Sequence, residues 1–164
     1  MIYVTVGNDF RPFDRLLKKM DEVAPSLSER VFIQKGYSAY SPRNASSFDF
    51  VSMEDATEYI LKARVVVSHA GIGTIILCRQ YGTPLLILPR RKTLGEHMND
   101  HQMEIARALE RKEAEQIHVV YEEEQIDETL LKILNRGQRS LPVPNPGKTN
   151  LLKVLRQFID TVAS

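Results

Sequence analysis

Short runs of apolar residues alternate along this chain with longer segments in which apolar residues recur every three or four positions. The short runs are typical of buried strands, and the periodic segments are typical of amphipathic helices. Strands are expected at residues 2–6, 31–34, 48–51, 65–67, 85–88 and 117–120. About six strand-to-helix alternations predict an α/β fold with one mostly parallel sheet and helices on both of its faces.

Helices are predicted between these strands, at residues 12–23, 53–63, 74–81, 103–112, 122–134 and 150–162. Ser52 and the acidic residues after it fit a helix start, where a side-chain oxygen caps free amides and carboxylates meet the positive end of the dipole. Gly82 fits the end of the helix at 74–81, and Pro84 bars its continuation. Residues 37–47 have no period and are interpreted as a loop, and the proline-rich residues 141–147 as a connector.

Composition narrows the class of protein. The 164 residues contain 43% hydrophobic and 26% charged residues, which is ordinary for a globular chain, and the length favours a single domain spanning residues 1–164. The 22 basic residues nearly balance the 21 acidic ones and leave a net charge of +1. A chain-wide basic surface for nucleic acid is therefore absent, and we expect no nucleic-acid partner.

The single cysteine and the lack of long apolar runs indicate the compartment. Cys78 has no second cysteine to pair with, so an intrachain disulfide or a cysteine metal site is impossible and a reducing compartment fits best. No apolar run approaches the roughly 20 residues that cross a bilayer. The amino end, MIYVTVGND, lacks the features of a signal peptide. We expect a cytoplasmic protein that reaches a membrane only through a partner.

Residues 64–102 are the most informative stretch. They read as a strand, a glycine turn with the sequence SHAGIGT, a helix and a second strand. Such a unit places backbone N–H groups and the positive end of a helix dipole at the carboxyl end of a parallel sheet, where α/β proteins bind phosphate groups. The hypothesis that follows is that this turn binds the phosphates of a nucleotide.

Two other interpretations of the turn stay open. SHAGIGT resembles the dinucleotide motif G-x-G-x-x-G, but Ile76 stands at the third glycine. The acidic ribose ligand expected about 20 residues later is also absent, and Arg90 and Arg91 lie in that neighbourhood, which keeps an NADP-binding module possible. Alternatively, Gly71 and Gly73 only permit a tight strand-to-helix turn.

Two side chains of the turn also have a structural and a functional interpretation each. His69, at the end of a buried strand, is either a ligand contact or a hydrogen-bonded core residue. Thr74 either gives its hydroxyl to a phosphate or caps the following helix.

A second polar segment follows the strand at 85–88. Asn99 and Gln102 have the spacing of a capping box before the helix at 103–112. A cap does not need the other polar residues of this segment, which are Glu96, His97, Asp100 and His101. Their density after the carboxyl end of a strand favours a binding site. The spacing of the two histidines matches no zinc motif, so we predict no metal site.

Four segments together resemble the carboxyl-terminal, donor-binding half of the family 28 glycosyltransferases. They are YVTVGNDFRPFDRLL, SHAGIGT, YGTPLLILPRR and GEHMNDHQMEIA, and they span almost the whole chain in the family's order. The resemblance implies a Rossmann-like domain, the carboxyl-terminal half of the GT-B fold. More narrowly, the chain resembles the small soluble subunit of two-part UDP-sugar transferases. Such subunits serve the dolichol-pathway GlcNAc transferase and its bacterial counterparts in exopolysaccharide and capsule assembly.

The resemblance also implies roles for individual residues. It assigns the donor diphosphate to the turn and the first residues of its helix, namely His69, Ala70, Gly71, Gly73 and Thr74. It assigns the donor sugar to Glu96, Asn99, Asp100, His101 and Gln102, and the lining of the cleft to Gly7 and Asn8. Many members have a ribose-binding glutamate where this chain has Leu77, so the resemblance does not fix the nucleotide.

The implied reaction is sugar transfer with inversion from a UDP-sugar, which is a substrate, so no cofactor is expected. Backbone N–H groups and a helix dipole can stabilise the leaving diphosphate without a metal, an effect commonly worth a few kcal/mol. The acceptor site and the base are expected on a membrane-associated companion subunit that presents a lipid-linked acceptor. The chain should then bind a UDP-sugar and be inactive alone. A non-catalytic partner-binding protein with an unused cleft remains the other alternative.

Overall fold

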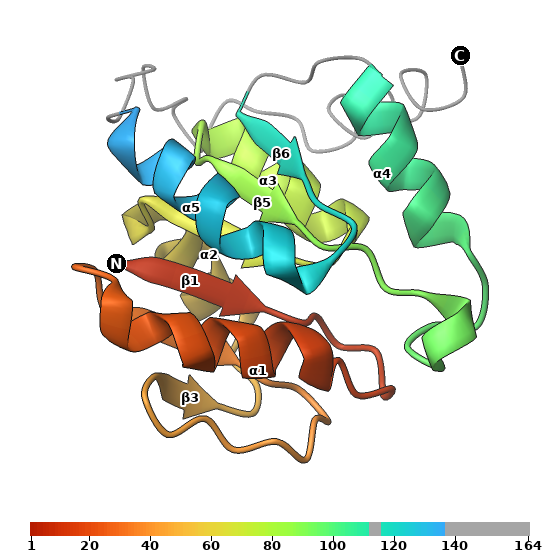
Figure 1. The fold of residues 1–164 in the computed structure, drawn as a ribbon, viewed down its shortest axis with the longest axis horizontal. Coiled ribbons are helices and arrows are strands. Elements are labelled where there is room, and N and C mark those ends of the chain that lie inside the picture. Colours follow the sequence, from red (N-terminus) through yellow and green to blue (C-terminus); the bar gives the residue numbers. More distant parts are fainter. Residues whose placement is uncertain (112–115, 137–164) are drawn as a thin grey trace.

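Six strands form one sheet in which every neighbouring pair is parallel, in the order β3-β2-β1-β4-β5-β6 (Figure 1). The computed structural model describes residues 1–111 and 116–136. The strands are β1 (Ile2–Thr5), β2 (Val31–Gln34), β3 (Ser46–Phe48), β4 (Val65–Ser68), β5 (Leu85–Ile87) and β6 (Ile117–Val119). The predicted parallel α/β sheet is confirmed.

Helices cover both faces of this sheet. They are α1 (Asp14–Val23), α2 (Met53–Lys62), α3 (Ile72–Tyr81), α4 (His101–Arg111) and α5 (Ile126–Asn135), with short 3-10 turns η1 (Ala24–Ser26), η2 (Lys92–Leu94) and η3 (Glu123–Gln125). Alternate side chains of β1 point to opposite faces, so Val4 belongs to a core with α1 and α5, whereas Tyr3 belongs to a core with α2, α3 and α4. No helix of the described residues is both long and apolar enough to cross a bilayer.

The strand order places a topological switch point between β1 and β4, the kind of position at which open parallel sheets form a ligand crevice. The chain proceeds from β1 outward to β2 and β3, then returns through α2 to β4 on the other side of β1. Connections therefore diverge in opposite directions from the carboxyl ends of β1 and β4, which is the position where open parallel sheets bind ligands. Because Thr5 lies opposite Ser68 in the register, the residues after these strands are neighbours.

Several local predictions are confirmed. The strand at 31–34 has the expected bounds. Ser52 caps α2 by accepting a hydrogen bond from the amide of Asp55. Gly82 ends α3 with a left-handed φ of 67°. The helix predicted at 122–134 begins as η3, with a capping box between Glu122 and Gln125, and continues as α5.

Several predicted bounds are wrong, among them the start of α1, which is Asp14 and not residue 12, and the start of α4, which is His101 and not residue 103. The third strand is Ser46–Phe48 and not 48–51, because it is a polar edge strand whose serines are exposed, and no apolar run marks it in the sequence. Helix α3 begins at Ile72, two residues before the predicted Thr74, because Gly71 and not a polar side chain stands at its N-cap. The predicted connector at 141–147, the predicted helix at 150–162 and the end of the helix predicted at 103–112 lie outside the described residues.

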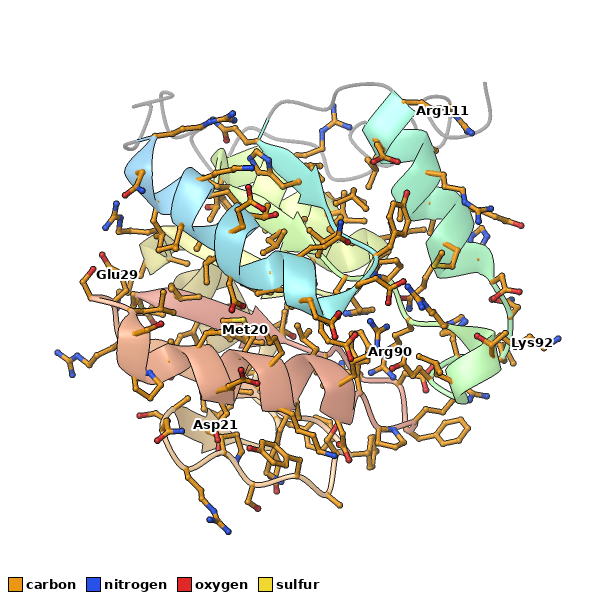
Figure 2. The ribbon with its side chains drawn as sticks, viewed as in Figure 1. Met20, Asp21, Glu29, Arg90, Lys92 and Arg111 are labelled. Carbon is orange, nitrogen blue, oxygen red and sulfur yellow. The ribbon has the colours of Figure 1, made fainter. Side chains whose placement is uncertain are left out.

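A buried carboxylate on α1 holds the segment that leads into β3. Asp21 is 3% exposed and accepts hydrogen bonds from the backbone amides of Arg43, Asn44 and Ala45 and from the Tyr40 hydroxyl, at 2.7–3.1 Å (Figure 2). Burial alone would raise the pKa of Asp21, but these bonds, led by that from Arg43, outweigh burial and hold the pKa below its usual value. The ionised carboxylate thus organises the 40–45 segment.

Replacing Asp21→Asn should lower the free energy of unfolding by about 2 kcal/mol, because hydrogen bonds to a charged, buried acceptor are lost. The depressed pKa means that this stabilisation is complete above the carboxyl's unfolded pKa of 3.8 and is lost as the pH falls through the lower folded value. The urea stabilities of the two forms should therefore differ fully above about pH 4 and converge only as the pH falls through the lower folded pKa of Asp21. Asp49→Asn, which removes an exposed pair with Lys35, is the control and should cost under about 1 kcal/mol. An equal loss in both variants would contradict the role of Asp21.

Candidate functional site

The amino end of α3 lies at the crevice and is left free for an anion. The amides of Ile72, Gly73 and Thr74 have no hydrogen-bond partner within the described residues, and no side chain caps them. Of the five helices in this part of the chain, α3 alone has no acidic residue in its first turn. The partial positive charge of this helix end is therefore not offset by its own residues.

The imidazole of His69 lies between two glycines from different loops. A Cβ added to Gly7 would come within 2.5 Å of His69 Cε1, and one added to Gly71 within 2.2 Å of His69 Nε2. Gly7 also has a φ of +72°, which favours glycine. The turn after β1 and the turn after β4 thus meet at the His69 ring, and both need a residue without a side chain.

The hydrogen bonds around His69 define which ring nitrogen carries the proton. The Ser68 hydroxyl donates to the Thr5 carbonyl at 3.0 Å, so its oxygen is free to accept from His69 Nδ1 at 3.2 Å. This arrangement assigns the proton to Nδ1 and leaves Nε2 without one. Burial, and then the positive charge of Arg90, lower the pKa of His69 to about 4, so the ring is neutral at physiological pH.

The side chains of Thr5 and Gln34 hold the Gly7 turn in place through hydrogen bonds. Thr5 Oγ1 donates to the Gln34 side-chain oxygen, Gln34 Nε2 donates to the Gly7 carbonyl at 3.1 Å, and the Gly7 amide donates to Thr5 Oγ1 at 3.2 Å. Asn8, the next residue, is exposed. The turn is therefore rigid up to Gly7, and Asn8 presents its side chain to solvent.

Gly73 differs from the two glycines that contact His69. A Cβ added to Gly73 would meet no atom within 4 Å, and the residue lies inside the first turn of α3 with ordinary helical geometry. Glycine in a helix costs about 0.5–1 kcal/mol relative to alanine. Nothing in the described structure requires a glycine here, so the open space is available to a ligand that approaches the backbone.

The loop between β5 and α4 is anchored by Glu96. This carboxylate is 6% exposed, and its two oxygens accept from Arg15 Nε and Nη2 at 3.0 and 2.9 Å, while one also accepts from the Arg91 amide at 2.9 Å. Glu96 thus ties its loop to α1. The predicted sugar-side residues Asn99, Asp100 and His101 follow on the exposed part of the loop and at the start of α4.

The predicted capping box at the start of α4 is wrong. Helix α4 begins at His101, whose amide donates to Asn99 Oδ1 at 3.1 Å. Gln102 is 6% exposed and turns inward, where its Oε1 accepts from the backbone amide of Arg90 at 3.1 Å. The buried amide of Arg90 has no strand partner, so it binds the Gln102 side chain that was expected to cap α4. Gln102 therefore lies against the end of β5.

Sequence reasoning considered Arg90 only for an NADP site and missed its place between the loops of the candidate site. Arg90 is completely buried, and its guanidinium donates to the carbonyls of Val6 at 2.8 Å, Arg11 at 2.8 Å and Glu96 at 3.0 Å, with the Phe13 ring 4.8 Å away (Figure 2). The available signal was its position directly after a buried strand, in the segment PLLILPRR.

The arginines no longer support an NADP site. Arg90 is buried, and Arg91 is engaged with Glu122 at 2.7 Å and with the Tyr121 carbonyl. Neither guanidinium is both exposed and unpaired, as direct contact with a ribose 2′-phosphate would require, so the two residues do not support the NADP interpretation. The two histidines considered for zinc have separate neighbours: His97 Nε2 lies 4.0 Å from a carboxylate oxygen of Asp9, and His101 contacts Glu104 at 3.2 Å.

The structure therefore brings the predicted diphosphate residues together with Gly7. Gly7, His69 and Gly71 are in contact, Ala70 is buried behind them, and Gly73 and Thr74 lie on the following helix. Leu77, at the position of the family's ribose-binding glutamate, lies further along α3 and packs against the core.

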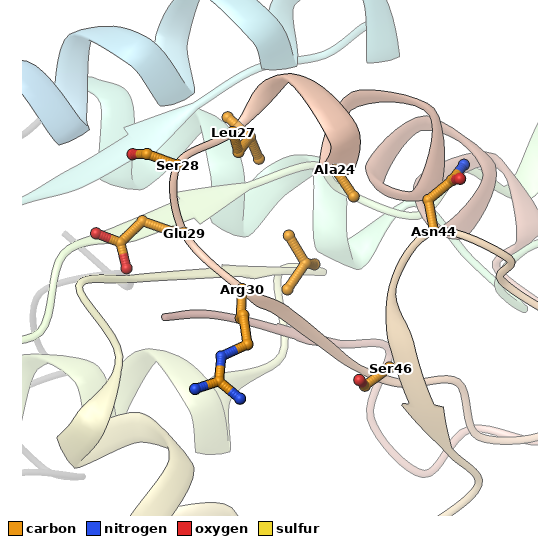
Figure 3. A pocket seen from close by; sticks show the side chains of 8 residues that line it. Ala24, Leu27, Ser28, Glu29, Arg30, Asn44 and Ser46 are labelled. Carbon is orange, nitrogen blue, oxygen red and sulfur yellow. The ribbon is translucent and has the colours of Figure 1, made fainter.

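A different pocket lies at the opposite edge of the sheet, next to the starts of β2 and β3 (Figure 3). It is lined by Ala24, Leu27, Ser28, Glu29, Arg30, Val31, Asn44 and Ser46. Ligands of parallel α/β sheets bind outside the carboxyl ends of the strands, and this pocket is at the amino ends. It is therefore separate from the candidate site.

Comparison with known proteins identifies relatives along nearly the whole chain. Residues 1–157 match the family model of the glycosyltransferase family 28 C-terminal domain. The chain is 29% identical over 119 residues to the human UDP-N-acetylglucosamine transferase subunit ALG13, an alignment that covers 66% of this chain and 10% of the human protein. The chain thus spans about a tenth of the length of this curated relative.

Solved structures show the same fold. The NMR structure of ALG13 has a TM-score of 0.58 at 18% identity and covers 99% of this chain and 96% of its own. The glycotransferase of kitacinnamycin has a TM-score of 0.60 at 14% identity, covering 99% of this chain and 40% of its own. MurG of Acinetobacter baumannii has a TM-score of 0.56 at 16% identity, covering 98% and 44%. In the last two proteins the shared fold is less than half of the chain.

The contact between Gly71 and His69 can be tested by a double-mutant cycle. Gly71→Ala should lower the free energy of unfolding by about 1–3 kcal/mol, because the new Cβ overlaps the imidazole. Adding His69→Ala should remove the overlap, so that the double variant is more stable than the sum of the two single losses predicts. Chemical denaturation of the four proteins measures this coupling. Strictly additive losses would mean that the glycine and the ring do not share the space.

Proposed function

Because its residues 1–157 match the family model, this chain belongs to the glycosyltransferase family 28 C-terminal domains, and we propose that it is the donor-binding subunit of a two-component, inverting glycosyltransferase. In this proposal it holds a UDP-sugar whose sugar passes to a lipid-linked acceptor in exopolysaccharide, capsule or oligosaccharide synthesis. The observation that carries the proposal is the uncapped, acid-free amino end of α3 with open space above Gly73.

The proposed diphosphate contacts come mainly from the backbone. The free amides at the start of α3 and the helix dipole favour the two phosphate groups and the charge that grows on them as the sugar leaves. Ala70 is buried, so only its backbone is available, whereas Thr74 can add its hydroxyl. In its assigned tautomer His69 has no proton on Nε2, so the ring serves to space the Gly7 and Gly71 backbones. This arrangement is the support for transfer without a metal or cofactor.

The proposed sugar contacts come from the loop before α4. Asn99, Asp100 and His101 present exposed polar groups that can bind sugar hydroxyls. Glu96 and Gln102 are engaged inside the protein, so we propose that they act by holding this loop at the ends of α1 and β5. The human relative of this chain is itself a UDP-N-acetylglucosamine transferase subunit, which favours a UDP-sugar as the donor.

We further propose that a companion subunit covers the cleft and supplies the acceptor site and the base. Of the eight large apolar side chains that are exposed in the described residues, six lie on segments that follow the carboxyl ends of strands. We call these residues the apolar rim; they are Phe10, Tyr37, Phe50, Met53, Leu94 and Met98. Exposed apolar groups gathered at one edge are typical of a protein interface. A membrane-associated companion would hold this chain at the cytoplasmic face of the membrane.

The donor proposal is tested by Gly73→Ala. The variant should unfold with a free energy equal to or up to about 1 kcal/mol above that of the parent, because alanine is the better helix former. Its methyl group should nevertheless reduce UDP and UDP-sugar affinity by about tenfold or more, since it occupies the space above the amides. Calorimetric titration measures the affinity, and a thermal-shift panel should show stabilisation of the parent by UDP-sugars and not by NADP.

Arg79→Ala is the matched control for this experiment, because Arg79 is exposed in the last turn of the same helix. It should leave UDP affinity unchanged. Unaltered binding by Gly73→Ala, or a parent protein that no UDP-sugar stabilises, would refute the placement of the diphosphate at α3.

The partner proposal is tested by charged substitutions in the apolar rim. A membrane fraction from the source cells, stripped of this subunit, should regain sugar transfer when the purified chain is added. Phe10→Glu and Met98→Glu should each reduce this activity by about tenfold or more, because a charge would be buried in the interface. Leu131→Glu, on the exposed face of α5 away from the rim, should retain full activity. Equal activity of all three variants would exclude the rim as the docking surface.

A further inference from the structure

We infer that Arg90 is a positioning residue of the donor site: a buried, permanently charged guanidinium that holds the diphosphate side and the sugar side at a fixed spacing and whose charge the donor diphosphate neutralises. The inference rests on the proposed function and adds to it the residue that joins the two halves of the site. Neither the free helix end nor the polar loop before α4 identifies such a residue by itself.

Arg90 joins segments that lie far apart in the sequence. Its Nη2 donates to the Val6 carbonyl, immediately before Gly7, and its Nη1 donates to the Arg11 carbonyl, both at 2.8 Å. Its Nη1 also donates to the Glu96 carbonyl at 3.0 Å, and its own amide binds the Gln102 side chain at 3.1 Å. One side chain thus connects the loop after β1 with the loop before α4. Because Gly7, which follows Val6, packs against the His69 ring of the diphosphate turn, we expect a change at Arg90 to shift the two ends of a bound donor relative to each other.

The positive charge of Arg90 has no carboxylate partner. Arg11, Arg15, Arg64 and Arg91 each form an ion pair with an acidic side chain, and these arginines are all partly exposed. Arg90 is fully buried and forms no ion pair within the described residues. The Nε atoms of Arg90 and Arg91 are both buried donors without a partner there, so the missing ion pair is what distinguishes Arg90 from Arg91. Buried charges are normally paired, because leaving water is costly. An anion bound in the crevice supplies the missing negative charge.

The positive charge of Arg90 acts on titratable groups at the cleft. The charged and titratable groups that interact with Arg90 are Asp9 and Arg11 on the loop after β1, His69 on the turn after β4, and Glu96 on the loop before α4. Glu96 is neutralised by Arg15, and Asp9 is paired with Arg11. Burial and then the charge of Arg90 lower the pKa of His69. Burial would raise the pKa of Asp9, but the hydrogen bonds and charge of Arg11, and after them the charge of Arg90, lower it. A positive potential therefore extends from Arg90 to the diphosphate turn.

Three variants separate the charge of Arg90 from its geometry. Arg90→Met removes both, Arg90→Lys keeps the charge without the planar fork, and Arg91→Met removes a neighbouring guanidinium whose partner is Glu122. The ligands are uridine, UDP and UDP-N-acetylglucosamine, whose affinities are measured by calorimetric titration. The ratio of UDP to uridine affinity reports on the phosphates, and the ratio of UDP-sugar to UDP affinity reports on the sugar.

The expected results differ for each variant. Arg90→Met should reduce the UDP-to-uridine ratio by about tenfold or more, because the buried charge is lost. Arg90→Lys should keep most of that ratio but reduce the UDP-sugar-to-UDP ratio by about threefold or more, since one ammonium group cannot hold both loops. Arg91→Met should leave both ratios unchanged. If Arg90→Met does not fold, Arg90→Lys decides, and unchanged ratios in that variant would overturn the inference.

An NMR titration of the imidazole distinguishes this inference from the proposed function. The pKa of His69 should rise in Arg90→Met, because the positive charge that lowers it is lost, and should stay the same in Arg91→Met. In Arg90→Lys the pKa of His69 should rise if the ammonium group lies further from the ring. A parent protein that binds UDP no better than uridine would refute the proposed function, whatever the His69 titration shows. A parent that prefers UDP, with Arg90 variants that behave like Arg91→Met in binding and titration, would overturn only the role of Arg90.

Discussion

The parallel pairing of β1 with β4 is the constraint on which the candidate site depends. Their register sets Thr5 opposite Ser68, so the two chains leave the sheet side by side and in different directions. The Ser68 hydroxyl joins the two strand ends through the Thr5 carbonyl, and the His69 ring fills the narrow space between Gly7 and Gly71. A cleft edge that is built on the central strands of a sheet has little freedom to move, which suits a site that must present backbone amides in fixed positions.

Charge is arranged around this cleft in two different ways. Two acidic groups of the surrounding loops form ion pairs with arginines, Glu96 with Arg15 and Asp9 with Arg11. The positive groups at the crevice, which are the start of α3 and the Arg90 guanidinium, have no such partner among the described residues. The same loops therefore carry paired charges for stability and unpaired positive charge where the ligand is proposed to bind.

Much of the fold follows from local sequence pattern, because buried strands and amphipathic helices have characteristic periods. The glycine turn after β4 was placed correctly for the same reason: an apolar run, two glycines and a helical segment are adjacent in sequence. The errors have a common cause. Gln102 leaves its expected cap for the amide of Arg90, and Arg90 itself bonds to carbonyls as far away as Val6, 84 residues earlier. Contacts between such distant residues have no local signal, and neither does β3, whose exposed serines lack an apolar pattern. The roles of the individual sugar-side residues stay predictions.

The serine-rich strand β3 has a consequence for how the chain behaves in a crowded cell. It stands at one margin of the sheet, and its outward backbone groups are available for pairing with any extended peptide. Only three residues long, polar and strongly solvated, it offers a poor template for such growth. We therefore expect this margin of the sheet to contribute little to ordered self-aggregation during the interval between synthesis and any assembly that the chain enters.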